Sequence, residues 1–111
     1  MNVYDRLLQI IEEKRSRVIF SCDVTSMERL IDLTEICGPY ICVLKVHTDI
    51  ILDFSLEKML EVQKLSKKHN FLIMEDRKFG DVGHTIYNQI SGFFNYKEWA
   101  DLVKERTTFF E

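Results

Sequence analysis

The stretch "FLIMEDRKFGDVGHT" (residues 71–85) joins a run of four apolar residues to a cluster of charged ones. An apolar run of this length is typical of a strand that is buried on both faces of a parallel sheet. Asp76 and Lys78 follow the run two positions apart, so their side chains point to the same side if the strand geometry continues. Paired charges are expensive to place inside a fold. Their position therefore predicts that the end of this strand faces a functional site.

The same pattern, an apolar run that ends in a charge, occurs at two earlier places in the chain. The run 18–22 ends at Asp23, and the run 40–44 ends at Lys45. A weaker fourth run, residues 99–103, contains a charge of its own. Stretches with apolar residues at helical spacing separate the runs. Strands that alternate with helices predict parallel β/α units in a sheet covered by helices.

Four helices are expected around these strands. Apolar residues at helical spacing predict an amphipathic helix over residues 3–15. The Thr-x-x-Glu spacing that begins at Thr25 is that of a capping box, so the next helix is expected to start there and to end at Gly38-Pro39. A third helix is expected over residues 56–69, and a shorter one from about Gly83.

In parallel α/β folds, ligands and chemistry gather beyond the carboxyl ends of the strands. The charged residues that follow the three apolar runs should therefore meet at one rim; they are Asp23, Lys45, His47, Asp76 and Lys78. Two alternatives stay open. Asp23 could simply cap the following helix, and His47 could be a structural histidine with satisfied hydrogen bonds.

A row of alternating charges is expected at this rim. Lys45, on the strand beside Asp76 and Lys78, would place a cation on each side of the carboxylate, which keeps both lysines protonated. At about 4 Å and an effective dielectric near 20, each contact amounts to roughly 4 kcal/mol before desolvation is subtracted. Asp81 lies further along, between Gly80 and Gly83, where it could cap the short helix.

Composition excludes several classes of protein. The 111 residues carry a formal net charge of −3, so the chain lacks the basic field that attracts nucleic acid. Three cysteines, Cys22, Cys37 and Cys42, lack metal-ligand spacing and are expected to be buried, reduced thiols. Residues 1–17 contain no apolar signal-peptide core, and no apolar run approaches the ~20 residues that span a bilayer. These features predict a cytoplasmic protein without membrane contact.

Several motifs resemble those of one enzyme family. The pattern Asp-x-Lys-x-x-Asp over residues 76–81 is similar to the signature of the eukaryotic orotidine 5'-phosphate decarboxylases, the type that also forms the C-terminal domain of UMP synthase. Other stretches follow the family in order and spacing, from about Tyr4 to Val103; they are Cys22-Asp23-Val24, Gly38-Pro39-Tyr40-Ile41-Cys42, Leu44-Lys45-Val46-His47-Thr48-Asp49-Ile50, Asn70-Phe71-Leu72-Ile73 and Glu98-Trp99-Ala100-Asp101.

The resemblance implies a function and a set of site residues. The reaction would convert orotidine 5'-monophosphate (OMP) to uridine 5'-monophosphate (UMP) and CO2 in pyrimidine synthesis, without a metal or an organic cofactor. Lys78 would protonate the ring carbon that CO2 leaves, and Asp76 would lie beside the departing carboxylate. Lys45 would order this network and touch the ribose. Asp23 would bind a ribose hydroxyl, and His47 would line the site.

The resemblance also implies a dimer with shared sites. Asp81 and Thr85 would cross the interface into the partner's active site, which replaces the capping role expected for Asp81. The sequence departs from the family at three positions near the signature. Val46 stands in place of a usual threonine, Gly80 of an alanine and His84 of an asparagine. None of these changes removes a charged group.

The chain is short for the fold that the resemblance implies. A (β/α)8 barrel takes about 250 residues, so the expected fold class is α/β, a truncated (β/α)8 TIM barrel with about four parallel β/α units preceded by an N-terminal helix. Residues 1–103 would form the N-terminal half of the barrel and residues 104–111 a divergent tail. The first and fourth strands are expected to be open edges. Phe109 and Phe110 could cover part of the exposed surface.

Two functions follow from this reading. In the first, the chain is an orotidine 5'-phosphate decarboxylase by descent, inactive or very weak alone because the phosphate-binding half is absent. It would then bind OMP or UMP, if any ligand, and form a homodimer. In the alternative, it is a non-catalytic interaction protein that pairs with full-length decarboxylase, or with another partner, through the retained dimer-forming rim.

Overall fold

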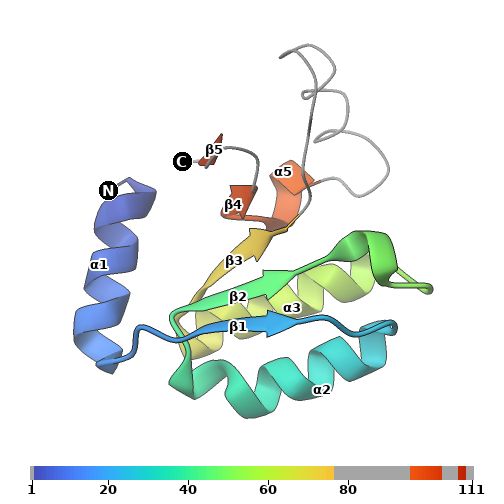
Figure 1. Cartoon of the computed structure of the whole chain (residues 1–111), viewed down its shortest axis with the longest axis horizontal. Coiled ribbons are helices and arrows are strands. Elements are labelled where there is room, and N and C mark those ends of the chain that lie inside the picture. The colour runs from blue at the N-terminus through green and yellow to red at the C-terminus, as the bar shows by residue number, and fades with distance from the viewer. Residues whose placement is uncertain (1, 77–95, 104–107, 110–111) are drawn as a thin grey trace.

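A computed structural model describes residues 2–76, 96–103 and 108–109 as one sheet with helices on one face and at one end (Figure 1). In chain order the elements are α1 (Val3–Lys14), β1 (Ile19–Cys22), α2 (Met27–Cys37), η1 (Gly38–Tyr40), β2 (Val43–Val46), η2 (Thr48–Ile50), α3 (Leu56–His69), β3 (Leu72–Glu75), α5 (Tyr96–Trp99), β4 (Leu102–Val103) and β5 (Thr108–Phe109).

The sheet has the strand order β1-β2-β3-β4-β5, and its first four strands are parallel. Phe20 is paired with Leu44, and Leu44 with Ile73, so the first three strands run level. The expected alternation of strands and helices is therefore confirmed. Figure 1 shows α2 and α3 along one face of the sheet and α1 standing at the end where the strands begin.

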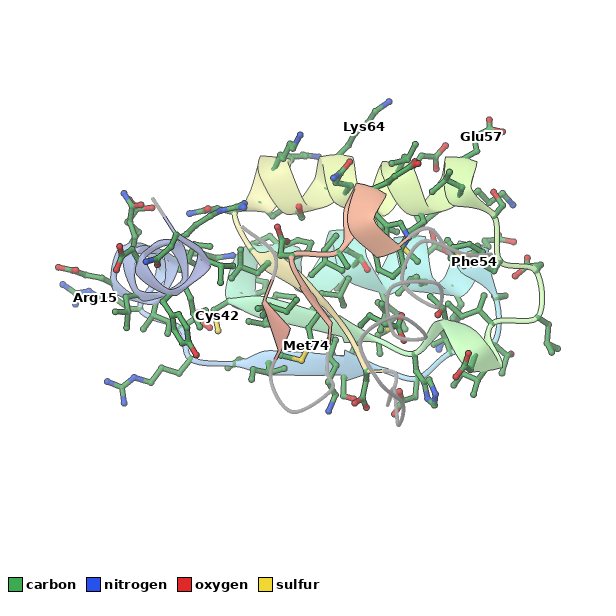
Figure 2. All side chains as sticks on the ribbon, turned by 90° about the horizontal axis from the view of Figure 1, so that it is seen from above. Arg15, Cys42, Phe54, Glu57, Lys64 and Met74 are labelled. Carbon is green, nitrogen blue, oxygen red and sulfur yellow. The ribbon has the colours of Figure 1, made fainter. Side chains whose placement is uncertain are left out.

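Two apolar clusters hold these layers together. The larger lies between the sheet and α2 and α3, and its fully buried members include Met27, Leu30, Leu44, Val46, Met59, Val62, Phe71 and Ile73. The smaller lies where α1 meets the sheet and contains Val3, Ile10, Cys42, Val43, Leu72 and Leu102. Figure 2 shows α1 end-on with Cys42 beside it. Alternate residues of β2 and β3 serve the two clusters, as the period of a strand requires.

Several element boundaries differ from those expected. β2 spans Val43–Val46 rather than residues 40–44, because Gly38–Tyr40 form a 3₁₀ turn before the strand can begin. Lys45 therefore lies within the strand and not after it. The capping residue of α2 is Ser26, whose hydroxyl accepts from Arg29 N, and not Thr25. Thr25 instead accepts a hydrogen bond from Leu52 N through its carbonyl oxygen.

The expectation of an open edge at the fourth strand was wrong. β4 pairs with β5, a strand from the tail, and the pairing is antiparallel, with Leu102 opposite Phe109. The tail therefore supplies backbone partners where a full barrel would add another parallel strand. Phe110 and the expected helix from Gly83 lie outside the described residues.

Asp101 ties β4 to the sheet through its side chain as well as its backbone. Its Oδ2 accepts from Ile73 N at 2.8 Å, its own N–H donates to Ile73 O at 2.8 Å, and Arg6 of α1 lies 3.4 Å from Oδ1. Burial raises the pKa of this carboxyl, while the Ile73 hydrogen bond and Arg6 oppose the shift. The charge within the fourth run is thus a structural anchor.

Lys14, the last residue of α1, closes the end of the sheet where the strands begin. Its ammonium donates to four backbone carbonyl oxygens at 2.6–2.9 Å, those of Gly38, Ile41, His69 and Asn70. Three of these carbonyls, those of Gly38, His69 and Asn70, lie at the C-terminal ends of α2 and α3, where helix dipoles concentrate negative charge, and Ile41 follows η1. Burial lowers the pKa of Lys14. One side chain therefore joins three helices.

Replacing Lys14 with methionine should lower the free energy of unfolding by about 2–3 kcal/mol, because the four carbonyl oxygens that Lys14 donates to would lose their charged hydrogen-bond donor. Urea unfolding followed by circular dichroism measures the change. The matched control is Lys64→Met on α3, where the side chain points away from the sheet (Figure 2). The control should change stability by less than about 0.5 kcal/mol. Equal effects of the two substitutions would contradict the anchoring role.

Deleting residues 104–111 should increase self-association, because it removes β5 and leaves the backbone groups of β4 without their strand partner. Size-exclusion chromatography with light scattering, run over a range of concentrations, measures the effect. The control is Lys64→Met, an exposed position on α3 away from the edge strand. A shortened chain with an unchanged mass distribution would show that β5 does not protect the edge.

Candidate active site

The carboxyl ends of the first three strands bring four of the predicted site residues to one rim. Asp23 directly follows β1, Lys45 and His47 flank the last residue of β2, and Asp76 directly follows β3. The register places the strand ends side by side, since Val46 is paired with both Cys22 and Glu75. The rim therefore forms from residues that are more than fifty positions apart in the chain.

Lys45 and Asp76 form an ion pair at this rim, with 3.6 Å between Nζ and Oδ2. The two side chains are 25% and 23% exposed, so water reaches them but does not surround them. Asp76 N also donates to Val46 O at 2.8 Å, which extends the ladder between β2 and β3 by one residue. The backbone thus holds the carboxylate beside the ammonium, and the other cation of the expected array, Lys78, lies outside the described residues.

His47 and Asp23 are less closely tied to this pair. The His47 imidazole lies 3.7 Å from a carboxylate oxygen of Asp49 in η2, and the two side chains are 35% and 42% exposed. Asp23 is exposed, and the helix-capping alternative for it is excluded because Ser26 caps α2. Asp23 therefore stands at the rim without the structural role that could have explained it.

Two acidic residues that the sequence did not predict as site residues stabilise the loops of the rim. Glu75 is fully buried, and both of its carboxylate oxygens lie 3.4 Å from Thr48 N at the start of η2. Asp53 accepts from Met27 N at 2.9 Å and so joins the loop after η2 to the start of α2. Strand alternation offered a signal for Glu75, because it must face away from the side that Asp76 faces.

The remaining predicted site residues lie outside the described part of the chain. They are Lys78, Asp81 and Thr85. Among the described residues, no group of three or more His, Cys, Asp or Glu side chains could hold a metal ion. Within those same residues, no helix is long and apolar enough to cross a membrane.

Cys22, the last residue of β1, is a buried thiol directly before Asp23. Burial, with smaller contributions from Cys37 and Asp23, raises its pKa to about 11. Cys42 is also buried, and burial raises its pKa too. At neutral pH both cysteines are thiols rather than thiolates, so neither is an activated nucleophile. Cys37 is only partly buried, in contrast to the expectation for all three.

Comparison with known proteins gives consistent matches. The model of the orotidine 5'-phosphate decarboxylase / HUMPS family matches residues 16–105. An orotidine 5'-phosphate decarboxylase from Pichia kudriavzevii is 50% identical over 100 residues, which are 88% of this chain and 38% of that protein. One from Coccidioides posadasii is 52% identical over 99 residues, covering 88% of this chain and 36% of the relative. The chain thus spans less than two-fifths of the length of these relatives.

A solved structure supports the fold. The crystal structure of a protein assigned as orotidine 5'-phosphate decarboxylase, from Streptomyces avermitilis, superposes with a TM-score of 0.64 at 16% identity. The match covers 93% of this chain and 44% of the other. The expected fold class, a truncated TIM barrel, agrees with this partial coverage.

Alkylation of the folded chain at pH 8 should leave Cys22 almost unmodified, because a thiol with a pKa near 11 is about one part in a thousand thiolate at that pH. Iodoacetamide labelling followed by peptide mass spectrometry measures each cysteine separately. Labelling of Cys22 should rise as the pH is raised toward 11. The unfolded chain in guanidinium provides the control, in which all three cysteines should react. Rapid labelling of Cys22 in the folded chain at pH 8 would contradict its burial.

Proposed function

Because the chain belongs to the orotidine 5'-phosphate decarboxylase / HUMPS family, we propose that its rim is one part of an active site that converts OMP to UMP and CO2. The observation that carries the proposal is the ion pair between Lys45 and Asp76, 3.6 Å apart at the carboxyl ends of adjacent parallel strands. The names of the relatives support the choice of substrate.

The proposed chemistry needs charges of this kind. The bond between the ring carbon and the substrate carboxylate breaks, CO2 leaves, and the electron pair stays on the ring carbon. Lys78, two positions after Asp76, stabilises this charge as an ammonium and then donates a proton to the carbon. Asp76 and Lys45 keep the local charges alternating, so that the proton donor stays charged and in place.

The other rim residues bind the rest of the nucleotide in this proposal. Lys45 and Asp23 bind ribose hydroxyls, and exposure of Asp23 at the rim leaves it accessible to a ligand. His47 lines the same site. Asp81 and Thr85 act in the site of a partner subunit, so the proposed working form is a homodimer in the cytoplasm. The reaction as proposed takes no metal or organic cofactor.

The 111-residue chain by itself should be inactive or very weak. It spans 36–38% of the length of the first relatives, and the groups that grip the substrate phosphate are proposed to lie in the remainder. Binding energy from remote parts of a substrate lowers the barrier at the reacting centre, so its loss reduces turnover as well as affinity. Site residues of the decarboxylase type can therefore be present in a chain that lacks full activity.

One observation favours the alternative, a non-catalytic protein that associates with full-length decarboxylase. β5 pairs antiparallel with β4, in the place where a full barrel continues with a parallel strand. This pairing covers the edge of β4 without a further parallel barrel strand. In this case the rim serves recognition between subunits rather than turnover.

A binding experiment tests the assignment of the rim without requiring turnover. Titration of the labelled chain with UMP should shift the amide resonances of Lys45, His47 and Asp76, with a weak dissociation constant because the phosphate grip is absent. Lys45→Ala should weaken binding by about tenfold, equivalent to 1.4 kcal/mol. The matched control Lys64→Ala, on the outer side of α3, should leave it unchanged. Shifts confined to other surfaces would contradict the assignment.

An activity assay separates the two functions. The purified chain with OMP should release CO2 at or near the uncatalysed rate. Turnover above that rate that is abolished by Lys78→Ala would overturn the proposed weakness of the isolated chain. Co-purification with full-length decarboxylase, in the absence of turnover and of UMP binding, would favour the interaction protein.

A further inference from the structure

Glu75 is an acidic residue inside the apolar layer between the sheet and the helices α2 and α3. Strand alternation places its side chain on the same side of β3 as that of Ile73, which belongs to the larger apolar cluster. Both residues are fully buried. Removing a carboxyl group from water costs free energy, so an apolar side chain would pack at this position at a lower cost. An acid here is therefore explained by the polar groups that it contacts.

One of these groups is the backbone N–H of Thr48. Its nitrogen lies 3.4 Å from each carboxylate oxygen of Glu75, so the two oxygens share the N–H. Thr48 is itself fully buried and is the first residue of η2. The contact joins β3 to the turn that follows β2, and Val46, the last residue of β2, is paired with Glu75 in the sheet. Glu75 therefore fixes the point at which the chain leaves β2.

The turn that Glu75 fixes carries His47 and Asp49. The backbone angles of His47, φ −128° and ψ 88°, are close to those of a strand, so its side chain lies on the same side of the sheet as that of Lys45. Its Nε2 is 3.7 Å from a carboxylate oxygen of Asp49. Thr48 stands between these two residues in the chain. A displacement of Thr48 would therefore move both His47 and Asp49 relative to Lys45.

We propose that Glu75 is a positioning residue of the rim: by holding the N–H of Thr48 it sets where His47 stands, and through His47 the affinity of the rim for a nucleotide. Glu75 acts through the turn and does not touch the ligand. The inference rests on the proposed function, because it assumes that the rim binds UMP. It adds a residue on the helix side of the sheet to a site whose ion pair, Lys45 with Asp76, lies on the opposite side.

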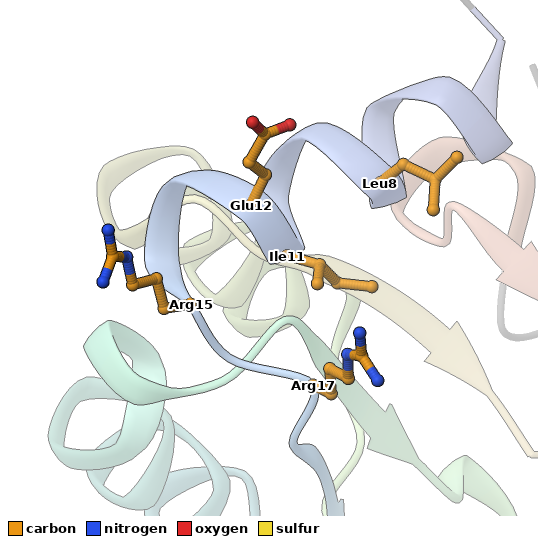
Figure 3. A pocket seen from close by; sticks show the side chains of 5 residues that line it. All are labelled: Leu8, Ile11, Glu12, Arg15 and Arg17. Atoms are coloured by element: carbon orange, nitrogen blue, oxygen red, sulfur yellow. The ribbon is translucent and has the colours of Figure 1, made fainter.

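A hollow with two arginines lies at the other end of the strands and provides an internal control. It measures about 490 Å³ and is lined by Leu8, Ile11, Glu12, Arg15 and Arg17. Figure 3 shows Leu8 and Ile11 on α1 and Arg17 on the segment that leads into β1. Guanidinium groups bind phosphate oxygens, so a nucleotide held by charge alone would bind there instead of at the rim.

Hydrogen exchange of the Thr48 amide, measured by NMR on the full 111-residue chain, tests the positioning without a ligand. Glu75→Leu removes the acceptor and should speed this exchange about tenfold. Glu75→Gln keeps an acceptor oxygen and should keep the rate within about threefold of the original. The matched control Ile73→Leu alters packing on the same side of β3 and should leave the rate unchanged. An unchanged rate in Glu75→Leu would overturn the proposal.

Titration with UMP tests the effect on binding. Glu75→Leu should weaken binding about tenfold although its far-ultraviolet circular dichroism matches that of the original chain, and Glu75→Gln should bind within about threefold of the original. A residue that serves packing alone would give another pattern, because an apolar side chain replaces a buried charge with little loss of stability. Equal UMP affinity in Glu75→Leu and the original chain would therefore overturn the proposal.

Two further variants keep the test decisive. Glu75→Met, with a flexible apolar side chain, replaces Glu75→Leu if leucine prevents folding, and the same losses are expected. Replacing both Arg15 and Arg17 with serine should leave UMP affinity unchanged. If that replacement abolishes binding, or if the original chain does not bind UMP, the proposed function and the effect of Glu75 on affinity both fail. The exchange rate of Thr48 would still show whether Glu75 holds the turn. Binding at the rim that Glu75→Leu leaves intact would overturn the inference alone.

Discussion

The parallel, level pairing of β1, β2 and β3 is the constraint on which the candidate site depends. Two carboxylates, Glu75 and Asp76, stand next to each other at the end of β3 and face opposite sides. The observed register turns Asp76 toward Lys45 and leaves Glu75 buried beside Thr48. A slip of β3 by one residue would exchange the two carboxylates and remove the ion pair. Strand register thus decides which acid serves the rim.

The interactions that fix this register lie away from the rim. Lys14 donates hydrogen bonds to four carbonyl oxygens near the start of β2 and β3. Asp101 accepts a hydrogen bond from the backbone N–H of Ile73 in the middle of β3. Apolar side chains between the strands and α2 and α3 supply the burial that holds the layers together. The rim can therefore keep charged, partly exposed side chains that contribute little to stability. The contacts that stabilise the sheet thus lie at the start and in the middle of the strands, away from the candidate site at their carboxyl ends.

Much of this arrangement could be predicted from the sequence. Apolar runs that end in charges indicated three parallel strands, and the helix over residues 56–69 was placed at its observed bounds. The meeting of Lys45 and Asp76 followed from that topology. Boundaries were less accurate because local patterns are ambiguous: Thr25 and Ser26 both suit a cap, and the structure uses Ser26. The pairing of β5 with β4 and the roles of Lys14 and Asp101 depend on contacts between distant parts of the chain, which spacing along a sequence does not reveal.

A double-mutant cycle on Lys45 and Asp76 tests the central claim most directly, since it measures whether strand pairing brings these two charges together. The free energy of unfolding is determined by urea for the original chain, Lys45→Met, Asp76→Asn and the double variant. The account predicts a favourable coupling energy of about 0.5–1.5 kcal/mol, which salt should reduce. Strictly additive effects, within about 0.3 kcal/mol, would show that the two side chains do not interact and would contradict the proposed rim.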